Sequence, residues 1–414
     1  MLWRTGRETV RARVAGAVRG THLGGFAVIM ATGIVSSALR GAGRPHLSAA
    51  ALAIAAAGFV VLASASALRA AAFPADLRRD LGCPASAFTN FAFVAACGVL
   101  GNRLASDGHA AAAAVLAAAA LGGWLALTCL VPGRMAVHYR DPPAVTDISG
   151  NWYLWAVGTQ SLAIAATFLA AGGIIRAQLA TLAAITAWSA GVMVYLLITV
   201  LVTVRLLLAG LGPQDPTAPY WVTMGGASIT VLVAAQILHG PGLTALGAAR
   251  PVLTAAAVIF WAVASSLIPL LIARGVWRHL ARHEPPRYRA DLWMIVFPAG
   301  MYATASMELG TAARLPLVHG VGAVAAWAAA AAWALTFAAM LVSSARRLPW
   351  AGRRVPGAKH PMPPGSLYRD TISTADDPGG RDGRQTRCGA TARTVTGRPG
   401  QPGAASRRVR RRAG

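Results

Sequence analysis

Ten runs of apolar residues, each long enough to cross a membrane as a helix, constrain the fold of this chain more than any other feature. A helix rises 1.5 Å per residue, so about 20 apolar residues span the ~30 Å hydrocarbon layer of a bilayer. Only 13% of the 414 residues are charged, against about 25% in a soluble domain. Most runs also lack the polar face that a soluble helix requires. We therefore expect an all-α integral membrane protein whose transmembrane helices cover Thr21–Leu39, Ala49–Arg69, Ala87–Leu104, Ala110–Val131, Ile148–Ala171, Leu179–Leu208, Ala218–His239, Val252–Ala273, Asp291–Leu309 and Leu317–Ser343.

The arginines in the loops predict the orientation of these helices, because loops rich in Lys and Arg remain in the cytoplasm. Arginine is concentrated in the N-terminal segment, in the tail and in every second loop, with five residues in the loop from Arg274 to Arg289. Both termini are therefore expected on the cytoplasmic side of the plasma membrane. That arrangement requires an even number of spans, which agrees with ten.

The composition divides the chain into three segments: a basic cytoplasmic N-terminus (1–20), a transmembrane domain (21–345) and a basic cytoplasmic tail (346–414). The tail carries 15 Arg and one Lys against four acidic residues, which is half of the formal net charge of +24. It is rich in Gly, Pro, Ser and Thr and has too few apolar residues for a core, so we expect it to be disordered. Because the rest of the charge lies mainly in short loops, it does not indicate a nucleic-acid partner.

Odd-numbered runs share a pattern that even-numbered runs lack, an aromatic residue near the start followed by glycine near mid-span. The repeating unit is a helical hairpin of about 65 residues, present five times. Five such hairpins can close in a quasi-five-fold arrangement around a central pore, with the odd helices inside and the even helices facing lipid. The alternative is that glycine marks close helix–helix packing, which is common in membranes. The glycines in question are Gly33, Gly98, Gly158, Gly225 and Gly300.

The polar residues within the runs are mostly hydroxyls and amides, and no Asp, Glu or Lys occupies a mid-span position. Coupled transporters place ionisable residues there, whereas anion pathways favour basic or neutral polar linings. We therefore predict a small anion as the substrate, with Thr32 and Thr159 among the groups that line its path. Ordinary hydrogen bonding between helices remains the alternative for such residues. The scattered His and Cys predict no metal site or cofactor, and no catalytic constellation indicates an enzyme.

Five segments in register resemble the tellurite-resistance/dicarboxylate-transporter family, which includes the plant slow-type anion channel. The Ala- and Arg-rich style is similar to actinobacterial members. The segments are FAVIMATGIVS (26–36), FTNFAFVAACGVLG (88–101), NWYLWAVGTQSLAI (151–164), YWVTMGGASITVL (220–232) and WMIVFPAGMYATAS (293–306). This chain has ATG instead of a GTG triplet in its first span and Met301-Tyr302 after Gly300, so the resemblance does not define the substrate.

The resemblance, over about residues 21–345, implies ten helices arranged as five hairpins around a pore, one pore per subunit, in a homotrimer in the lipid bilayer. It also implies that the Phe of a Phe-Pro pair in the ninth helix plugs the pore. That pair is Phe297-Pro298 here, and Pro298 removes a backbone donor and bends the helix. Packing of Phe297 against the first or seventh span is the alternative.

Two transport functions and one other class follow from these observations. The first is a channel or channel-like exporter in which a small anion passes down its gradient through a pore gated by Phe297. The second is a carrier of the same fold, either proton-coupled for malate or succinate or specific for tellurite or sulfite. The third, a membrane-embedded enzyme or a structural scaffold, lacks any catalytic constellation to support it.

Overall fold

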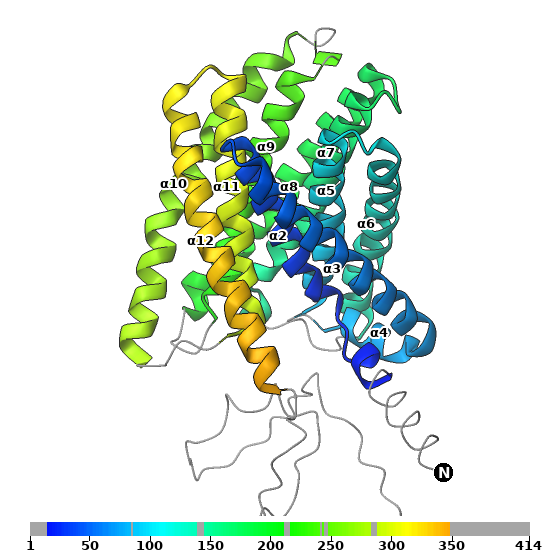
Figure 1. Ribbon diagram of the computed structural model, residues 1–414. Coiled ribbons are helices and arrows are strands. Elements are labelled where there is room, and N and C mark those ends of the chain that lie inside the picture. Colours follow the sequence, from blue (N-terminus) through cyan, green and yellow to red (C-terminus); the bar gives the residue numbers. More distant parts are fainter. Residues whose placement is uncertain are drawn as a thin grey trace, which may run out of the picture. The chain divides into compact units, whose positions relative to one another are not determined.

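The computed structural model describes residues 15–83, 86–138, 145–210, 216–240, 242–243, 247–282 and 288–347. The regular elements of these residues are all helices, as predicted (Figure 1). Contacts divide the chain into a unit Met1–Arg354 and a unit Val355–Gly414. The basic tail and most of the predicted N-terminal segment lie outside the described residues, so the predictions made for them stay predictions.

Shorter and longer helices alternate along the described chain. The shorter helices have 15 to 20 residues and are α2 (Ala27–Gly41), α5 (Ala92–Ser106), α7 (Tyr153–Ala171), α9 (Trp221–His239) and α11 (Trp293–Ala312). The longer helices have 28 to 34 residues and are α3 (Pro45–Ala72), α6 (Ala110–His138), α8 (Ala177–Ala209), α10 (Ala249–Arg282) and α12 (Pro316–Arg347). An amphipathic helix that the sequence did not predict, α4 (Pro74–Leu81), follows α3.

Every shorter helix begins with a turn of 3-10 helix, which the sequence pattern did not predict. The turns are η1 (Leu23–Phe26), η2 (Ala87–Phe91), η4 (Gly150–Trp152), η5 (Ala218–Tyr220) and η7 (Ala290–Leu292), and a further turn, η3 (Val145–Asp147), precedes η4. The tighter turn aligns side chains three residues apart on one face. It therefore fixes how each shorter helix enters the fold.

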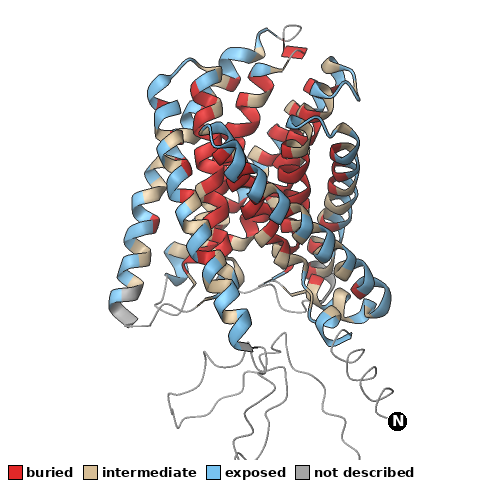
Figure 2. Cartoon of the chain, in the orientation of Figure 1, coloured by how far each residue is buried: buried red, intermediate tan, exposed pale blue. Residues whose placement is uncertain are grey.

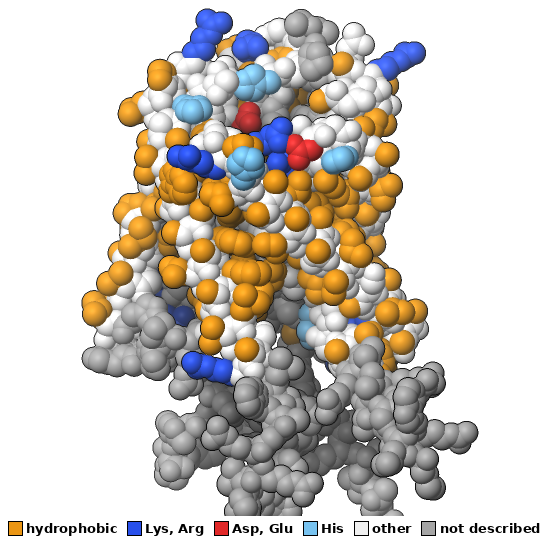
Figure 3. All heavy atoms as spheres, viewed as in Figure 1, with side chains coloured by type: hydrophobic (Ala, Val, Ile, Leu, Met, Phe, Trp, Pro, Cys, Tyr) orange, Lys and Arg blue, Asp and Glu red, His pale blue; other side chains and the backbone are white. Residues whose placement is uncertain are grey.

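The shorter helices form an inner layer and the longer helices an outer layer. In the apolar windows of α2, α7 and α9, 67–83% of residues are buried, against 17–28% in the five longer helices. Figure 2 shows the same division, with buried residues in the centre and exposed residues outside. The outward side chains are apolar, for example Val61, Leu196 and Leu270, each more than 45% exposed. Figure 3 shows a broad hydrophobic band on the face in view, with charged residues and His above it. Such a surface is suited to contact with lipid, because exposing this much apolar area to water would cost free energy.

Eight of the described helices are long and apolar enough to cross a membrane. The two remaining members of the alternating series, α5 and α11, belong to the inner layer and are more polar. Helix α5 has only 15 residues and includes Asn102 and Arg103, and α11 includes Glu308. The membrane character and the all-α class are thus confirmed, while ten spans stay a prediction.

The inner helices pack in chain order, α2 on α5, α5 on α7, α7 on α9 and α9 on α11. Helix α11 in turn packs on α2, so the last inner helix meets the first. Among the outer helices, α6, α8 and α12 each lie against two inner helices, their own hairpin partner and the next one in the series.

Hydrogen bonds from tryptophans, which we call tryptophan ties, join four outer helices to the inner layer. Each donates its indole N–H to an oxygen of the inner helix that starts the next hairpin, and α12 in this way joins α2. The bonds run from Trp124 Nε1 to Thr159 Oγ1 (2.9 Å), Trp188 Nε1 to the Thr230 carbonyl (3.0 Å), Trp261 Nε1 to Ser306 Oγ (2.9 Å) and Trp333 Nε1 to Thr32 Oγ1 (3.0 Å). Helix α3 has Phe59 instead, whose ring lies 5.5 Å from Phe26 and 6.2 Å from Phe93.

Candidate functional site

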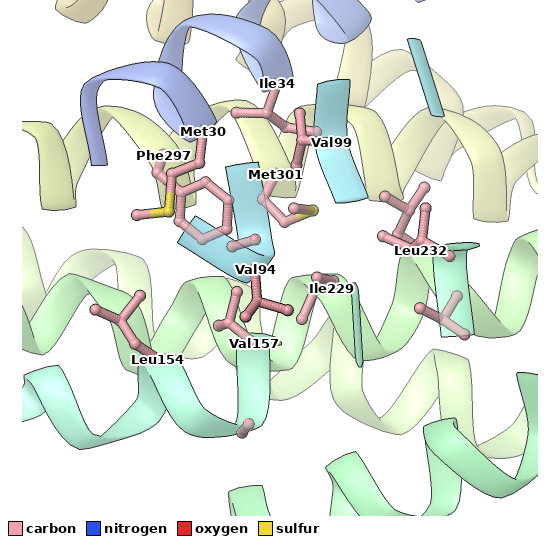
Figure 4. Close-up of a cluster of buried hydrophobic side chains, with 14 of the residues drawn as sticks. Met30, Ile34, Val94, Val99, Leu154, Val157, Ile229, Leu232, Phe297 and Met301 are labelled. Carbon is pink, nitrogen blue, oxygen red and sulfur yellow. The ribbon is translucent and has the colours of Figure 1, made fainter. Parts of the chain in front are cut away.

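The space between the inner helices is filled by apolar side chains. Figure 4 labels two from each inner helix, and none of them is more than 2% exposed. They are Met30 and Ile34 of α2, Val94 and Val99 of α5, Leu154 and Val157 of α7, Ile229 and Leu232 of α9, and Phe297 and Met301 of α11. Phe297 has the largest side chain of the set and is fully buried. An ion could not enter such a cluster without losing its hydration.

Pro298 sits beside Phe297 within α11 and packs against Gly225 of α9. A Cβ added to Gly225 would lie 3.0 Å from Pro298 Cγ and 3.4 Å from Phe297 Cε1. Proline offers no N–H to the carbonyl four residues earlier, so the helix is weakened at this point. The Phe-Pro pair therefore packs closely against α9, because Gly225 has no side chain at the contact.

The other four glycines predicted to line a pore lie at contacts between neighbouring inner helices. A Cβ at each position would come within 3.0 Å of a side chain on the adjacent inner helix or its leading turn. The nearest atoms are Val99 Cγ1 for Gly33, Ser161 Cβ for Gly98, Phe91 Cδ1 for Gly158 and Ile34 Cγ2 for Gly300. Such contacts agree with the alternative interpretation, in which glycine marks close packing between helices. That these glycines line a pore stays a prediction.

Thr32 and Thr159 use their hydroxyls within the helix layers. Each donates to the carbonyl four residues earlier, at 2.7 Å for Thr32 and 2.9 Å for Thr159. Each also accepts the indole N–H of an outer helix. Both hydroxyls therefore face the outer layer in this structure, and their role in lining a pore is likewise untested.

A buried arginine lies at the end of α5, where the sequence pattern indicated only an ordinary loop charge. Arg103 is 3% exposed, and its Nη1 lies 2.6 Å from Asp107 Oδ2. Its Nη2 donates to Ser48 Oγ at 3.0 Å and its Nε to Ser36 Oγ at 3.3 Å. Arg40 of α2 also pairs with Asp107. The cluster holds two cations against one carboxylate, so it gives this end of the inner layer a positive field.

The pKa of Asp107 is set by opposing effects. Burial raises the pKa of this carboxyl, but the hydrogen bond and charge of Arg103, together with Arg40, outweigh burial and place the pKa below its usual value. The carboxylate is therefore ionised at neutral pH. One signal in the sequence could have revealed the pair, because Arg103 and Asp107 have the i, i+4 spacing of neighbours on a helix.

A second cluster holds the segment that leads into α2. Arg69 at the end of α3 is 5% exposed and donates to Asp80 Oδ2 at 2.5 Å and to the Arg19 carbonyl at 2.9 Å. Asp80 also contacts His22 Nδ1 at 3.0 Å, and Arg19 pairs with Asp76 at 2.6 Å. Burial raises the pKa of Asp80, but His22 and Arg69 outweigh it, so the net shift is downward. Helix α4 thus fixes the entry to the first inner helix.

Comparison with known proteins agrees with this architecture. Residues 21–341 match the sequence model of the family described as voltage-dependent anion channel. This stretch covers all the inner and outer helices except the end of α12. The chain is also 42% identical over 159 residues to an uncharacterized membrane protein from two strains of Mycobacterium tuberculosis, covering 38% of this chain and 81% of that relative. The resemblance read from the five inner segments is therefore confirmed. This multi-pass membrane protein belongs to the voltage-dependent anion channel family.

Proposed function

We propose that the protein conducts a small anion across the plasma membrane along the axis between its inner helices, and that Phe297 closes this path. The observation that carries the proposal is the set of ten buried apolar side chains labelled in Figure 4, to which all five inner helices contribute and which we call the axial cluster. A hydrophobic constriction blocks ions because water leaves it. The family adds the substrate class, an anion.

The proposed path requires ten spans, arranged as five hairpins with quasi-five-fold order. The packing sequence of the inner helices, with α11 against α2, supports that arrangement. So do the four tryptophan ties, since each joins an outer helix to the next hairpin in the same sense. Helices α5 and α11 can be less apolar than the outer helices because the outer layer shields them from lipid.

The gate proposal places the motion at the Phe-Pro pair. Pro298 lacks the backbone bond that would stiffen α11 there, and Met30 and Met301 of the axial cluster have flexible side chains that can repack around a displaced ring. The glycines Gly33, Gly98, Gly158, Gly225 and Gly300 keep the inner helices close, so the open path is narrow at their level. Thr32 and Thr159 would line this path only after their hydrogen bonds to Trp333 and Trp124 had broken.

Charge supports the proposed orientation and a passive mechanism. The end where the inner helices begin carries Arg69, Arg79, Arg134 and Arg205, so we place it, and both termini, in the cytoplasm. Within the described inner helices, the acidic residue is Glu308 near the end of α11, whose Oε2 lies 3.9 Å from His239 Nδ1. This pair is the one feature that favours a proton-coupled carrier. It lies away from the axial cluster and is more than 40% exposed.

The homotrimer expected from the family resemblance remains part of the proposal. Its surface would come from the outer helices, whose apolar side chains face outward. In a trimer each subunit keeps its own path, so the functional test below does not depend on the oligomeric state.

The experiment is an anion-flux panel on protein reconstituted in liposomes, with chloride, nitrate, sulfite, malate and tellurite. Phe297→Ala should raise the flux of the preferred anion, because it removes the largest group of the axial cluster. Phe337→Ala, in the outer helix α12 where the ring stacks 5.0 Å from Trp333, is the matched control and should leave flux unchanged. Equal flux through wild type and a well-folded Phe297→Ala variant would refute the gate. Flux that depends on a pH gradient would favour the carrier instead.

A further inference from the structure

The five 3-10 turns that start the inner helices contact one another in chain order, η1 with η2, η2 with η4, η4 with η5 and η5 with η7. We call this arc of turns the collar. It brings together the N-terminal ends of the inner helices, whose first backbone N–H groups lack helical partners and carry partial positive charge. The joint between η4 and η5 is tight, because a Cβ on Gly150 would overlap the Pro219 carbonyl.

The collar also contains buried donors that the protein leaves unused. Trp152 is 9% exposed and Thr217 is 7% exposed. Within the described part of the chain, Trp152 Nε1, Thr217 Oγ1, Ser149 Oγ and Trp155 Nε1 are buried atoms with no hydrogen-bond partner. Unpaired buried polar groups are uncommon and costly, so four within or beside the adjacent turns η4 and η5 require an explanation.

Two of these residues occupy positions where their side chains would normally be used. Ser149 is the N-cap of η4 and Thr217 is the N-cap of η5, yet neither hydroxyl caps its own helix. An N-cap Ser or Thr usually accepts a backbone N–H of the first turn. Here both hydroxyls are left for another acceptor, while the Trp152 and Tyr220 N–H groups already donate to the Ser149 and Thr217 carbonyls at 3.1 Å.

The indoles are fixed in place by aromatic packing. The Phe88 ring of η2 lies 4.6 Å from the Trp152 ring and 5.8 Å from the Trp155 ring. An indole N–H can donate but not accept, so an acceptor is what this site lacks. Arg205, which is buried and bonded to the Tyr220 hydroxyl of η5, adds a positive charge nearby. Among the described residues of the collar and of η3, the acids are Asp147, which is engaged, and Asp291, which pairs with Arg289 at 3.1 Å.

We propose that Ser149, Trp152, Trp155 and Thr217 bind a small monovalent inorganic anion at the collar, before it enters the path between the inner helices. The proposal rests on the proposed function, since it assigns the entry site of the same path. The four donors are neutral, so they suit a single negative charge that must leave again. A dicarboxylate would call for more cations than Arg205 supplies.

Binding is tested without transport, by the line width of chloride-35 NMR on purified protein in detergent, with nitrate as the competing anion. Exchange of chloride with a protein site broadens the line, and nitrate should narrow it by displacement. Trp152→Phe keeps a ring against Phe88 and removes the donor. Thr217→Val keeps the shape and removes the hydroxyl. Loss of one donor to a charged ligand should weaken chloride binding about tenfold.

The matched control is Trp261→Phe, because the Trp261 N–H is already bound to Ser306. Its nitrate-sensitive broadening should equal that of the wild type. The proposal is overturned if the wild type shows no nitrate-sensitive broadening, or if Trp152→Phe and Thr217→Val both match the wild type. Its failure is distinct from failure of the proposed function, since chloride flux can persist without collar binding, and collar binding can persist when no anion crosses.

Discussion

The bond between Trp333 of α12 and Thr32 of α2 gives the sharpest test of how the layers are joined. It links residues 301 positions apart and joins the last hairpin to the first. Trp333→Phe removes the donor and keeps an aromatic ring. Thr32→Val removes the hydroxyl and keeps the shape. A double-mutant cycle built from these two changes isolates the contribution of the bond.

The expected magnitude follows from the partners that remain. Without Trp333, the Thr32 hydroxyl still donates to the Val28 carbonyl at 2.7 Å, so no buried donor is left unpaired on α2. The coupling free energy should therefore be ~0.6 kcal/mol, the average for hydrogen bonds between membrane helices, with ~1.7 kcal/mol as an upper bound. Trp333→Phe alone should lower the free energy of unfolding by more than the coupling free energy, because it also removes part of a packed ring.

The assay is unfolding of the four proteins in mixed micelles, followed by Trp fluorescence or circular dichroism. Trp327→Phe, at a tryptophan that is 48% exposed, is the control and should change the free energy of unfolding by less than about 0.5 kcal/mol. A coupling of zero within error, with both single variants folded, would mean that the indole and the hydroxyl are not bonded.

Three further predictions concern the clusters at the helix ends and the glycines. Arg103→Met should lower the free energy of unfolding by about 2 kcal/mol, since it leaves Arg40 as the remaining cation beside Asp107 and removes the donor to Ser48, and urea or SDS titration would measure it. The folded-state pKa of Asp107 is depressed, so its contribution to stability is present above the usual carboxylate pKa of about 3.9 and is lost as pH falls through the lower folded value. The contribution of Asp107 to thermal stability should then be constant from about pH 5 upward and fall in acid, so Asp107→Asn should show a smaller acid loss. Gly150→Ala should cost about 2–3 kcal/mol in the same titration through overlap with the Pro219 carbonyl. Its counterpart Gly122→Ala, where nothing lies within 4 Å, should stabilise α6 by about 0.5–1 kcal/mol.

The alternation of inner and outer helices could be predicted because it depends on composition. Outer helices need only apolar side chains toward lipid, whereas inner helices need small residues where backbones approach and polar residues where they meet one another. An aromatic residue near the start followed by glycine near mid-span therefore marks α2, α5, α7, α9 and α11, although outer helices also carry glycines, such as Gly123 and Gly191, where inner side chains approach. The same pattern could not tell which helix each glycine faces, because a period of 3.6 residues defines a face but not its partner.

The tryptophan ties show a different limit of sequence reasoning. Trp124, Trp188, Trp261 and Trp333 recur at similar depth in the outer runs, and a buried indole N–H requires an acceptor. That much could be read from the sequence. The acceptors could not, because each belongs to the following hairpin, and for Trp333 the acceptor is at the opposite end of the chain. The 3-10 turns and the burial of Arg103 were not predicted for a similar reason, since their partners come from loops and helix ends that have no periodicity.

Thr32 is the residue at which the packing and lining interpretations can be separated by measurement. If its hydroxyl serves the tie to α12, Thr32→Val and Trp333→Phe should lower stability in parallel, and neither should change the order of anions in the flux panel. If Thr32 lines the path, Thr32→Val should change that order while Trp333→Phe, which frees the hydroxyl, should increase flux. The structure favours the first outcome, because the hydroxyl already has a donor and an acceptor and has no further hydrogen to offer a passing anion. An anion would have to displace the Val28 carbonyl as the acceptor of that single hydrogen, and in this structure the axial cluster lies between the inner helices instead.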